Sequence, residues 1–346
     1  MFVGLKNKNK IKQKVGMVYF IFDLDETLAE LYSVYYFATS LQFELGILES
    51  NLDKAALDKA YQYFVRDILL TEISNEPLGI LRPGILGIMK KLKNLQKVGK
   101  IKNVLIYSNN GDIKSLEFIK NLIHLHVGGG LIKECIHRNH HMRANERVNA
   151  PHLINKTWNV LRNIMINGNT RAATNLVTTD VYFFDDLDHP DLRKKLGMNY
   201  YKVPKYDYKA SVNRIGEIYK IAIYKANIKG AKLKKFVNII LDEYDTNDTN
   251  SVTYDTSIDG VIKLLKNLTT GNEQNHIILA SLPPPSPDIG ILMMDHAINR
   301  IEIKNELRRI KKRPLGLSKP KLQTKRRKLV NKEKSDLKVV GESISQ

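Results

Sequence analysis

The chain has 346 residues, 43% of them hydrophobic, which is enough for one large or two ordinary folded domains. Its single cysteine, Cys135, excludes an internal disulfide framework and is typical of a reducing compartment, where we expect it to be a buried apolar residue. No apolar run reaches the roughly 18 residues of a transmembrane helix, and the short run after the basic N-terminus ends in aspartates, unlike a signal peptide.

The formal net charge of +19 lies mostly at the two ends of the chain. Residues 1–15 contain five lysines and no acid, and residues 300–346 contain sixteen Lys or Arg and five Asp or Glu. Together these segments hold +16 of the total, so the middle of the chain is close to neutral. Basic ends of this kind indicate a polyanion partner, a nuclear address or a solubility function.

The first predicted element is a buried strand, Val18–Phe22, that runs directly into Asp23, Asp25 and Thr27. Side chains at positions i and i+2 of a strand share a face, and two carboxylates so close together require a cation or a shared proton. Magnesium, a hard ion that prefers oxygen ligands, is the ordinary solution. The alternative is a strand end followed by a turn or helix cap, where Asp and Thr are also favoured.

Residues 29–80 have helical spacing and predict an insertion of about fifty residues between two strands of the sheet. Its four clustered aromatic residues are expected to pack in the core rather than to stack on a substrate; they are Tyr32, Tyr35, Tyr36 and Phe37. Because the insertion directly follows the first motif, we expect the choice of substrate to be made there.

A second strand-to-helix unit follows. Arg82-Pro83-Gly84 opens a helix over Ile85–Leu95, since proline suits the first helical turn. A strand over Asn103–Tyr107 then ends in Ser108-Asn109-Asn110-Gly111, and a helix follows over Ile113–Ile123. This is again an apolar strand that delivers small polar residues at its carboxyl end.

The next segment contains a possible strand at Ile132–His137 and Lys156 at the start of a helix over Trp158–Met165. A strand over Val181–Phe184 ends in Asp185 and Asp186, so a buried strand ending in acids occurs for the second time. A further short strand is expected at Tyr200–Val203. The local histidines lack the ligand spacing of a zinc site and are expected to be solvated; they are His137, His140, His141 and His152.

The rest of the chain is predicted to be mainly helical. We expect helices near 209–228, 231–243, 258–268 and 293–312, a polar linker at 244–256 and an extended proline-containing linker at 283–287. The predicted organisation is therefore a basic arm (1–16), an α/β core (17–205) that contains the insertion, a helical extension (206–282), and a linker, helix and basic tail (283–346).

Four features follow one another along the chain: a strand that ends in Asp-x-Asp-x-Thr, a strand that ends in Ser, a Lys at the start of a helix, and a strand that ends in Asp-Asp. In this order they resemble the haloacid dehalogenase superfamily of aspartate-dependent phosphotransferases, over roughly residues 17–205. The resemblance implies a Rossmann-like parallel sheet between helices, with the insertion as a cap-like element. It also implies roles for individual residues. Asp23 would be the nucleophile, and Asp25 the general acid and then the base. Ser108 and Lys156 would contact the phosphoryl group, with Thr27 and Asn109 as further substrate contacts.

The same resemblance implies a Mg²⁺ site in which Asp185 and Asp186 join Asp23 and the main-chain carbonyl of Asp25. Superfamily ATPases lack an acid/base carboxylate at the position of Asp25, so its presence favours a phosphatase or mutase. Lys133 and Arg143 remain alternatives to Lys156, because the interval between Lys156 and Asp185 is long.

The Asp-Leu-Asp-Glu-Thr-Leu sequence, Arg82-Pro83-Gly84 and the Asp185-Asp186 pair resemble the phosphatases of the RNA polymerase II carboxy-terminal domain and their small relatives (the NLI-interacting factor-like family). A magnesium-dependent phosphatase of phosphoserine or phosphothreonine proteins is therefore the expected function. One alternative is a nucleotide or polynucleotide phosphatase, because the Ser108-Asn109 loop is similar to superfamily members of that kind. The other is an inactive nucleic-acid-binding scaffold.

The basic tail contains two clusters, at 311–313 and 325–328, that resemble a bipartite nuclear import signal. The segment 300–338 could also bind nucleic acid without sequence preference, through counterion release. The alternative is a solvated terminus without a partner. We expect an intracellular protein with no membrane association, and the two basic clusters indicate the nucleus as one location.

Overall fold

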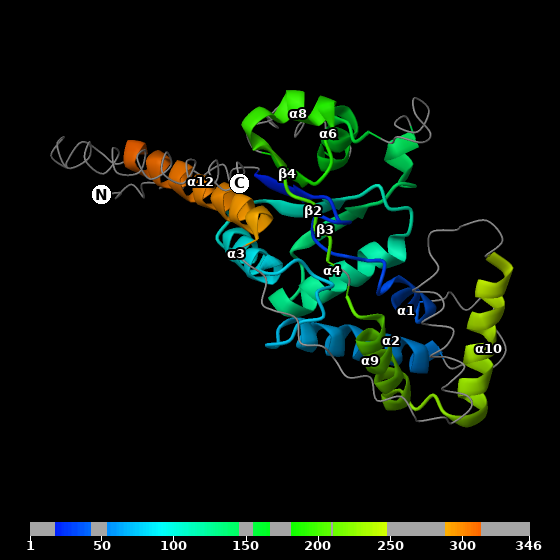
Figure 1. Ribbon diagram of the computed structural model, residues 1–346. Helices are drawn as coiled ribbons and strands as arrows, with labels where there is room; N and C mark the ends of the chain where they lie inside the picture. Colours follow the sequence, from blue (N-terminus) through cyan, green and yellow to red (C-terminus); the bar gives the residue numbers. More distant parts are fainter. Residues whose placement is uncertain are drawn as a thin grey trace, which may run out of the picture.

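The computed structural model describes residues 18–42, 54–144, 155–166, 181–208, 210–247 and 288–312. Within these ranges the protein is an α/β protein with a five-stranded, wholly parallel sheet in the order β3-β2-β1-β4-β5 (Figure 1). The strands are β1 (Tyr19–Phe22), β2 (Asn103–Tyr107), β3 (Ile132–Ile136), β4 (Val181–Asp185) and β5 (Tyr200–Lys202). The predicted parallel sheet between helices is thus confirmed.

The strand order places β1 at the centre, where the chain changes direction. The chain runs from β1 to β2 and β3 on one side, and then crosses to β4 and β5 on the other side. Phe22 pairs with Ile106 of β2 and with Phe184 of β4, so the three central strands end at the same level. In open α/β sheets, ligands bind beyond the carboxyl ends of the strands at such a reversal.

Helices cover both faces of the sheet (Figure 1). On one face lie α6 (Trp158–Ile166) and α8 (Pro190–Leu196), whose apolar side chains pack with Tyr19, Ile21 and Phe183. On the other face lie α3 (Ile85–Lys97) and α4 (Ile113–Val127), which pack with the alternate strand residues. Near-continuous apolar strands arise because both faces are buried.

The 29–80 insertion contributes α1 (Tyr35–Ser40) and α2 (Lys54–Glu72) to the larger of these two cores. Helix α2 packs on α4 and on α9 (Val212–Lys225), which comes from the predicted helical extension. Phe64 lies between Phe118 of α4 and Tyr219 of α9, with ring centroids 5.7 Å from each. The 29–80 insertion and the helical extension therefore form one layer that continues the core, although the sequence analysis predicted them as separate segments.

The remaining described helices are α10 (Gly230–Asn247) and α12 (Ile289–Lys312), with short 3-10 turns η1 (His141–Arg143) and η3 (Gly197–Asn199). Helix α12 lies beside α3, and Lys91 forms an ion pair with Asp295 across that contact. The expected helix at 258–268, the linkers at 244–256 and 283–287, the arm 1–16 and the basic cluster 325–328 lie outside the described residues, apart from the end of α10.

A smaller expectation concerns the single cysteine. Cys135 is buried in β3, and burial raises the pKa of its thiol to about 12, as expected of a structural cysteine. Among the described residues, no helix combines the length and the apolar character that a membrane span requires.

Candidate active site

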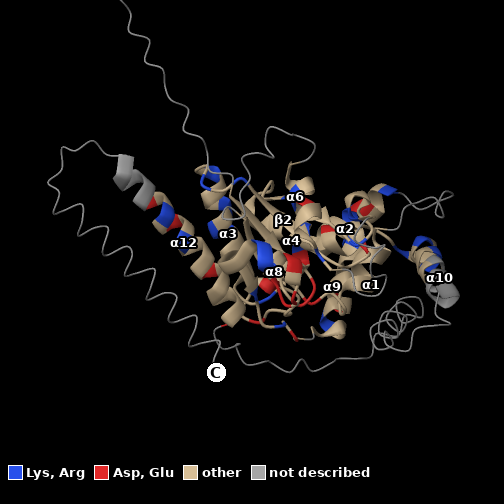
Figure 2. Ribbon diagram, turned by 90° about the horizontal axis from the view of Figure 1, so that it is seen from above, with Lys and Arg blue, Asp and Glu red and all other residues tan. Residues whose placement is uncertain are grey.

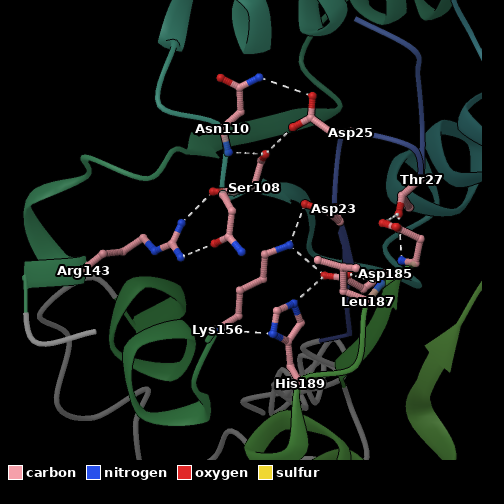
Figure 3. Close-up of polar contacts among 12 residues, drawn as sticks. Asp23, Asp25, Thr27, Ser108, Asn110, Arg143, Lys156, Asp185, Leu187 and His189 are labelled. Carbon is pink, nitrogen blue, oxygen red and sulfur yellow. Dashed lines mark hydrogen bonds and ion pairs between the residues drawn. The ribbon is translucent and has the colours of Figure 1, made fainter. Parts of the chain in front are cut away.

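The candidate site lies at the carboxyl ends of β1, β2 and β4. Acidic segments gather there beside α8, near the centre of Figure 2. Asp23 follows β1 directly and is held in line with β4, because its N–H donates to the carbonyl of Phe184 at 2.8 Å. Asp185 is the last residue of β4, and Ser108 is the first residue after β2. Residues that the sequence predicted at three separate strand ends are therefore neighbours (Figure 3).

Lys156 joins two of these strand ends. Its Nζ lies 2.5 Å from Oδ1 of Asp23 and 2.7 Å from Oδ2 of Asp185. All three side chains are buried, and Lys156 is only 1% exposed. Of the three cations considered for this position, Lys156 is the one that the structure brings to Asp23: Lys133 is exposed on β3, and Arg143 lies beside Ser108.

Asp23, Asp185 and Asp186 form a group that could hold a metal ion, with ligand oxygens all within 4.8 Å of one another. We call these three residues, together with Lys156, the acidic floor. No other group of this kind occurs among the residues that the structure describes.

The acidic floor is electrostatically uneven. Burial raises the pKa of Asp23 well above its ordinary range; Lys156 opposes this rise, and the charges of Asp185 and Asp25 add to it. Burial and the charge of Asp185 likewise raise the pKa of Asp186. Burial alone would raise the pKa of Asp185, but the contacts with Lys156 and His189 together outweigh it, and the pKa of Asp185 is lowered. One buried lysine thus does not compensate three carboxylates, and oxygen ligands in this arrangement fit a hard divalent cation such as Mg²⁺.

Asp25 lies at the pocket side of the floor and is held by the loop after β2. Its Oδ2 accepts a hydrogen bond from the Ser108 hydroxyl at 3.0 Å, and its Oδ1 accepts one from the Asn110 side-chain amide at 3.2 Å. Burial raises the pKa of Asp25, while these two hydrogen bonds act in the opposite direction. A carboxyl group with a raised pKa is suited to exchange a proton near neutral pH.

The resemblance implies that Ser108 contacts the phosphoryl group, but in the structure its hydroxyl is hydrogen-bonded to Asp25. Its hydroxyl donates to Asp25 and accepts from the backbone N–H of Asn110 at 2.9 Å, and the residue is fully buried. In this arrangement Ser108 orients Asp25. Asn110 also orients Asp25. It was not among the predicted site residues, although its position directly after Ser108-Asn109 could have indicated it.

The prediction that Thr27 contacts the substrate requires correction. Thr27 is fully buried, and its hydroxyl both donates to Oδ1 of Asp186 at 3.1 Å and accepts from the Asp186 N–H at 3.0 Å. Threonine at this position therefore fixes a metal-ligand candidate. The other predicted substrate contact, Asn109, does line the pocket, and its side-chain oxygen accepts a hydrogen bond from Arg143 at 2.7 Å.

Arg143 and His189 are buried polar residues that support the site, and no sequence pattern indicates this role for them. Arg143 donates to the carbonyl oxygen of Ser108 at 2.6 Å and lies over the ring of Tyr107. His189 lies 3.2 Å from Oδ2 of Asp185, and its other ring nitrogen accepts from the N–H of Lys156 at 3.4 Å. Such outer contacts orient the groups that perform chemistry.

A cavity of about 630 Å³ opens above the acidic floor. One side is formed by Tyr32, Tyr35 and Tyr36, which we call the tyrosine wall, and the other by Asn109, Asn110, Gly111 and Arg138. The expectation of core packing is confirmed for Phe37, which is buried, but is wrong for Tyr32, which is 57% exposed. Tyr35 and Tyr36 are only half-buried. Helical spacing identified the segment, but not the side of it that borders the cavity.

A scan of the chain against protein-family models finds no match, and the comparisons with curated proteins and with solved structures find none either. The fold and the site geometry therefore carry the functional argument, and the resemblance to the haloacid dehalogenase superfamily stays a prediction.

Proposed function

We propose that the protein is a magnesium-dependent phosphatase that hydrolyses phosphomonoesters through an aspartyl-phosphate on Asp23. The observation that carries this proposal is the contact of Lys156 with both Asp23 and Asp185, beside a third carboxylate and beneath an open cavity. A carboxylate nucleophile, a cation that compensates its charge and a ligand set for Mg²⁺ are the main requirements of this chemistry.

In the first half of the reaction, a carboxylate oxygen of Asp23 attacks phosphorus and the bond to the leaving oxygen breaks. Asp25 donates a proton to that oxygen, and burial, which raises the pKa of Asp25, favours the protonated form that this step requires. Lys156 stays beside Asp23 and compensates negative charge as it moves onto the phosphoryl oxygens. Mg²⁺, held by Asp23, Asp185, Asp186 and, as predicted, the carbonyl of Asp25, would supply further charge compensation.

In the second half, Asp25 is a carboxylate and accepts a proton from water, whose oxygen attacks phosphorus. The bond between phosphorus and Asp23 breaks, which releases phosphate and restores both aspartates. Ser108 and Asn110 keep Asp25 in place for both proton transfers. Because the first half requires protonated Asp25, turnover should fall as pH rises through the pKa of Asp25.

The experiment measures hydrolysis of p-nitrophenyl phosphate with Mg²⁺ from pH 5 to 8. Asp23→Asn should lower kcat by about 10³-fold or more, since it removes the nucleophile, and Asp25→Asn should also be severely impaired. Asp188→Asn, which changes an exposed aspartate paired with Arg193, is the matched control and should keep wild-type activity. Wild-type activity no higher than that of Asp23→Asn, with any of several divalent metals, would refute the proposal and favour the inactive scaffold.

The closer family resemblance predicts a phosphorylated protein as the substrate. That stays a prediction, and the proposal made here covers the reaction alone. The acidic floor contacts the phosphate and does not distinguish serine esters from others. Discrimination must come from the walls of the cavity, where the leaving group lies.

A further inference from the structure

The cavity above the acidic floor has one side with a chemical character of its own, the tyrosine wall. Tyr32 is the most exposed of its rings, at 57%. The rings of Tyr35 and Tyr36 meet edge to face, with centroids 4.8 Å apart and planes at 82°. The two rings therefore support each other, and together with Tyr32 they border the same cavity as Asp23 and Asp25. A planar ring in the leaving group would find stacking surfaces there.

The charges of the cavity lining argue against a leaving group that carries further phosphates. Arg138 is the only Lys or Arg among the described residues that line it. The lining also includes Glu26, which pairs with Lys205 at 2.8 Å, and Asp112, whose carboxylate caps the start of α4. Grooves that follow a nucleic-acid backbone are instead rich in basic residues. A neutral leaving group fits this lining better than a polyanionic one.

The tyrosine wall is also part of the body of the protein. The N–H of Tyr35 donates to the carbonyl of Leu31 at 2.9 Å, and the next residue but one, Phe37, is buried against Tyr219 of α9. The rings are thus carried on a segment anchored in the core, so a ring bound against them would meet a preformed surface.

We propose that the substrate is a nucleoside monophosphate, whose phosphate lies on the acidic floor while its base stacks on the tyrosine wall. This inference rests on the proposed phosphatase function and names its substrate class. A nucleoside is a neutral leaving alcohol with a planar ring, and stacking on tyrosine is tolerant of the identity of the base. A cavity of about 630 Å³ is of the size that such ligands occupy.

The test compares kcat/KM for AMP and dTMP with that for glycerol 2-phosphate, which has no ring. For the wild type, kcat/KM should be at least about ten-fold higher for both nucleotides, because glycerol 2-phosphate cannot make the stacking contact. The double variant Tyr32→Leu/Tyr35→Leu should lose about ten-fold on the nucleotides, mainly through KM, and change by less than two-fold on glycerol 2-phosphate. Tyr224→Leu, which alters a tyrosine 39% exposed on α9 and away from the cavity, is the matched control.

Several outcomes would overturn the inference. An equal loss on both substrate types, or a lowered melting temperature of the double variant, would mean that the wall serves the fold. The single Tyr32→Leu variant, at the most exposed ring, then decides: the inference fails if this variant does not lose activity selectively on the nucleotides. A wild type that prefers a phosphoserine peptide would assign the wall to a protein substrate, and preference for a 5′-phosphorylated oligonucleotide would assign it to strand ends. Activity on p-nitrophenyl phosphate without nucleotide preference rejects this inference alone, whereas inactivity on every substrate rejects the phosphatase itself.

Discussion

The acidic floor and the tyrosine wall border the same cavity but are built in different ways. The floor comes from the ends of β1 and β4 and from Lys156, two residues before α6, and its side chains are buried and joined by short polar contacts. The wall comes from α1 and the turn before it, and its rings are half-buried or exposed. In the proposed function, the reaction would therefore depend on the sheet, and the choice of substrate on the helical segment beside it.

The largest effect on the floor is expected from Lys156→Met, which leaves the buried Asp23 and Asp185 without their shared cation. Breaking a buried ion pair typically costs about 3 to 5 kcal/mol of unfolding free energy, and activity should fall with it. The loss should be smaller at pH 5 than at pH 7.5. Without Lys156 the pKa of each carboxyl rises, and binding of a proton then removes the buried charge. Urea denaturation at the two pH values measures this.

Lys91→Met is the matched control, because Lys91 also forms an ion pair at 2.5 Å, with Asp295, but is 55% exposed. An exposed pair contributes less than about 1 kcal/mol, and its loss should leave activity unchanged. Equal costs for the two variants would mean that Lys156 is no more important to the fold than a surface lysine.

A smaller effect is expected from Thr27→Val, which removes both hydrogen bonds between Thr27 and Asp186. Loss of such an outer contact typically weakens metal binding by about 10-fold or more, so Mg²⁺ titrated calorimetrically should bind that much less tightly. Thr39→Val serves as the control, since the Thr39 hydroxyl donates to the backbone carbonyls of Tyr35 and Tyr36 in its own helix, α1. Unchanged affinity for Mg²⁺ would remove Asp186 from the ligand set.

A further effect concerns the stability of the wall segment and not the chemistry, through Glu72 at the end of α2. Its carboxylate accepts the N–H of Ile80 at 3.0 Å, and the carbonyl of Ile80 in turn accepts the N–H of Glu30, two residues before Tyr32. Burial raises the pKa of Glu72 from its ordinary value to about 7. The folded state therefore binds this proton more tightly than the unfolded state, and stability is lost as pH rises from about 4.5 through 7.

Glu72→Gln should remove this pH-dependent loss of unfolding free energy, which is at most about 3 kcal/mol for the rise in the pKa of Glu72. Urea denaturation at pH 5, 6, 7 and 8 should give a flatter dependence for the variant, with the two proteins diverging as pH rises. Parallel curves would show that Glu72 does not titrate in this range.

The three acids of the floor could be predicted from the sequence because each has a local signal, whereas Lys156 was one of three cations that the sequence left open. Apolar runs that end in Asp23 or in Asp185 and Asp186 predict buried strands with charged carboxyl ends, and parallel strands bring such ends to one edge. The elements themselves were also predicted closely: the strand expected at Ile132–His137 ends one residue earlier, and the helix expected at Ile113–Ile123 continues to Val127.

The tyrosine wall and the supporting residues could not be predicted in the same way. An aromatic cluster with helical spacing suits a core and a cavity equally well, and only the packing of α4 and α9 beside α1 decides that Phe37 is buried while Tyr32 is exposed. His189 and Arg143 act through contacts to residues far away in the chain, for which the sequence contains no local pattern. Thr27 carried a signal, but its partner Asp186 lies 159 residues away.

The central claim is that Asp23 carries the phosphoryl group, and ¹⁹F NMR with beryllium fluoride and Mg²⁺ tests it without a known substrate. Beryllium trifluoride binds to carboxylate oxygens as a stable equivalent of the aspartyl-phosphate. The wild type should give protein-bound fluorine signals that require Mg²⁺ and that are lost in Asp23→Asn but kept in Asp188→Asn. No bound signal in the folded wild type, or a signal that persists in Asp23→Asn, would contradict the account.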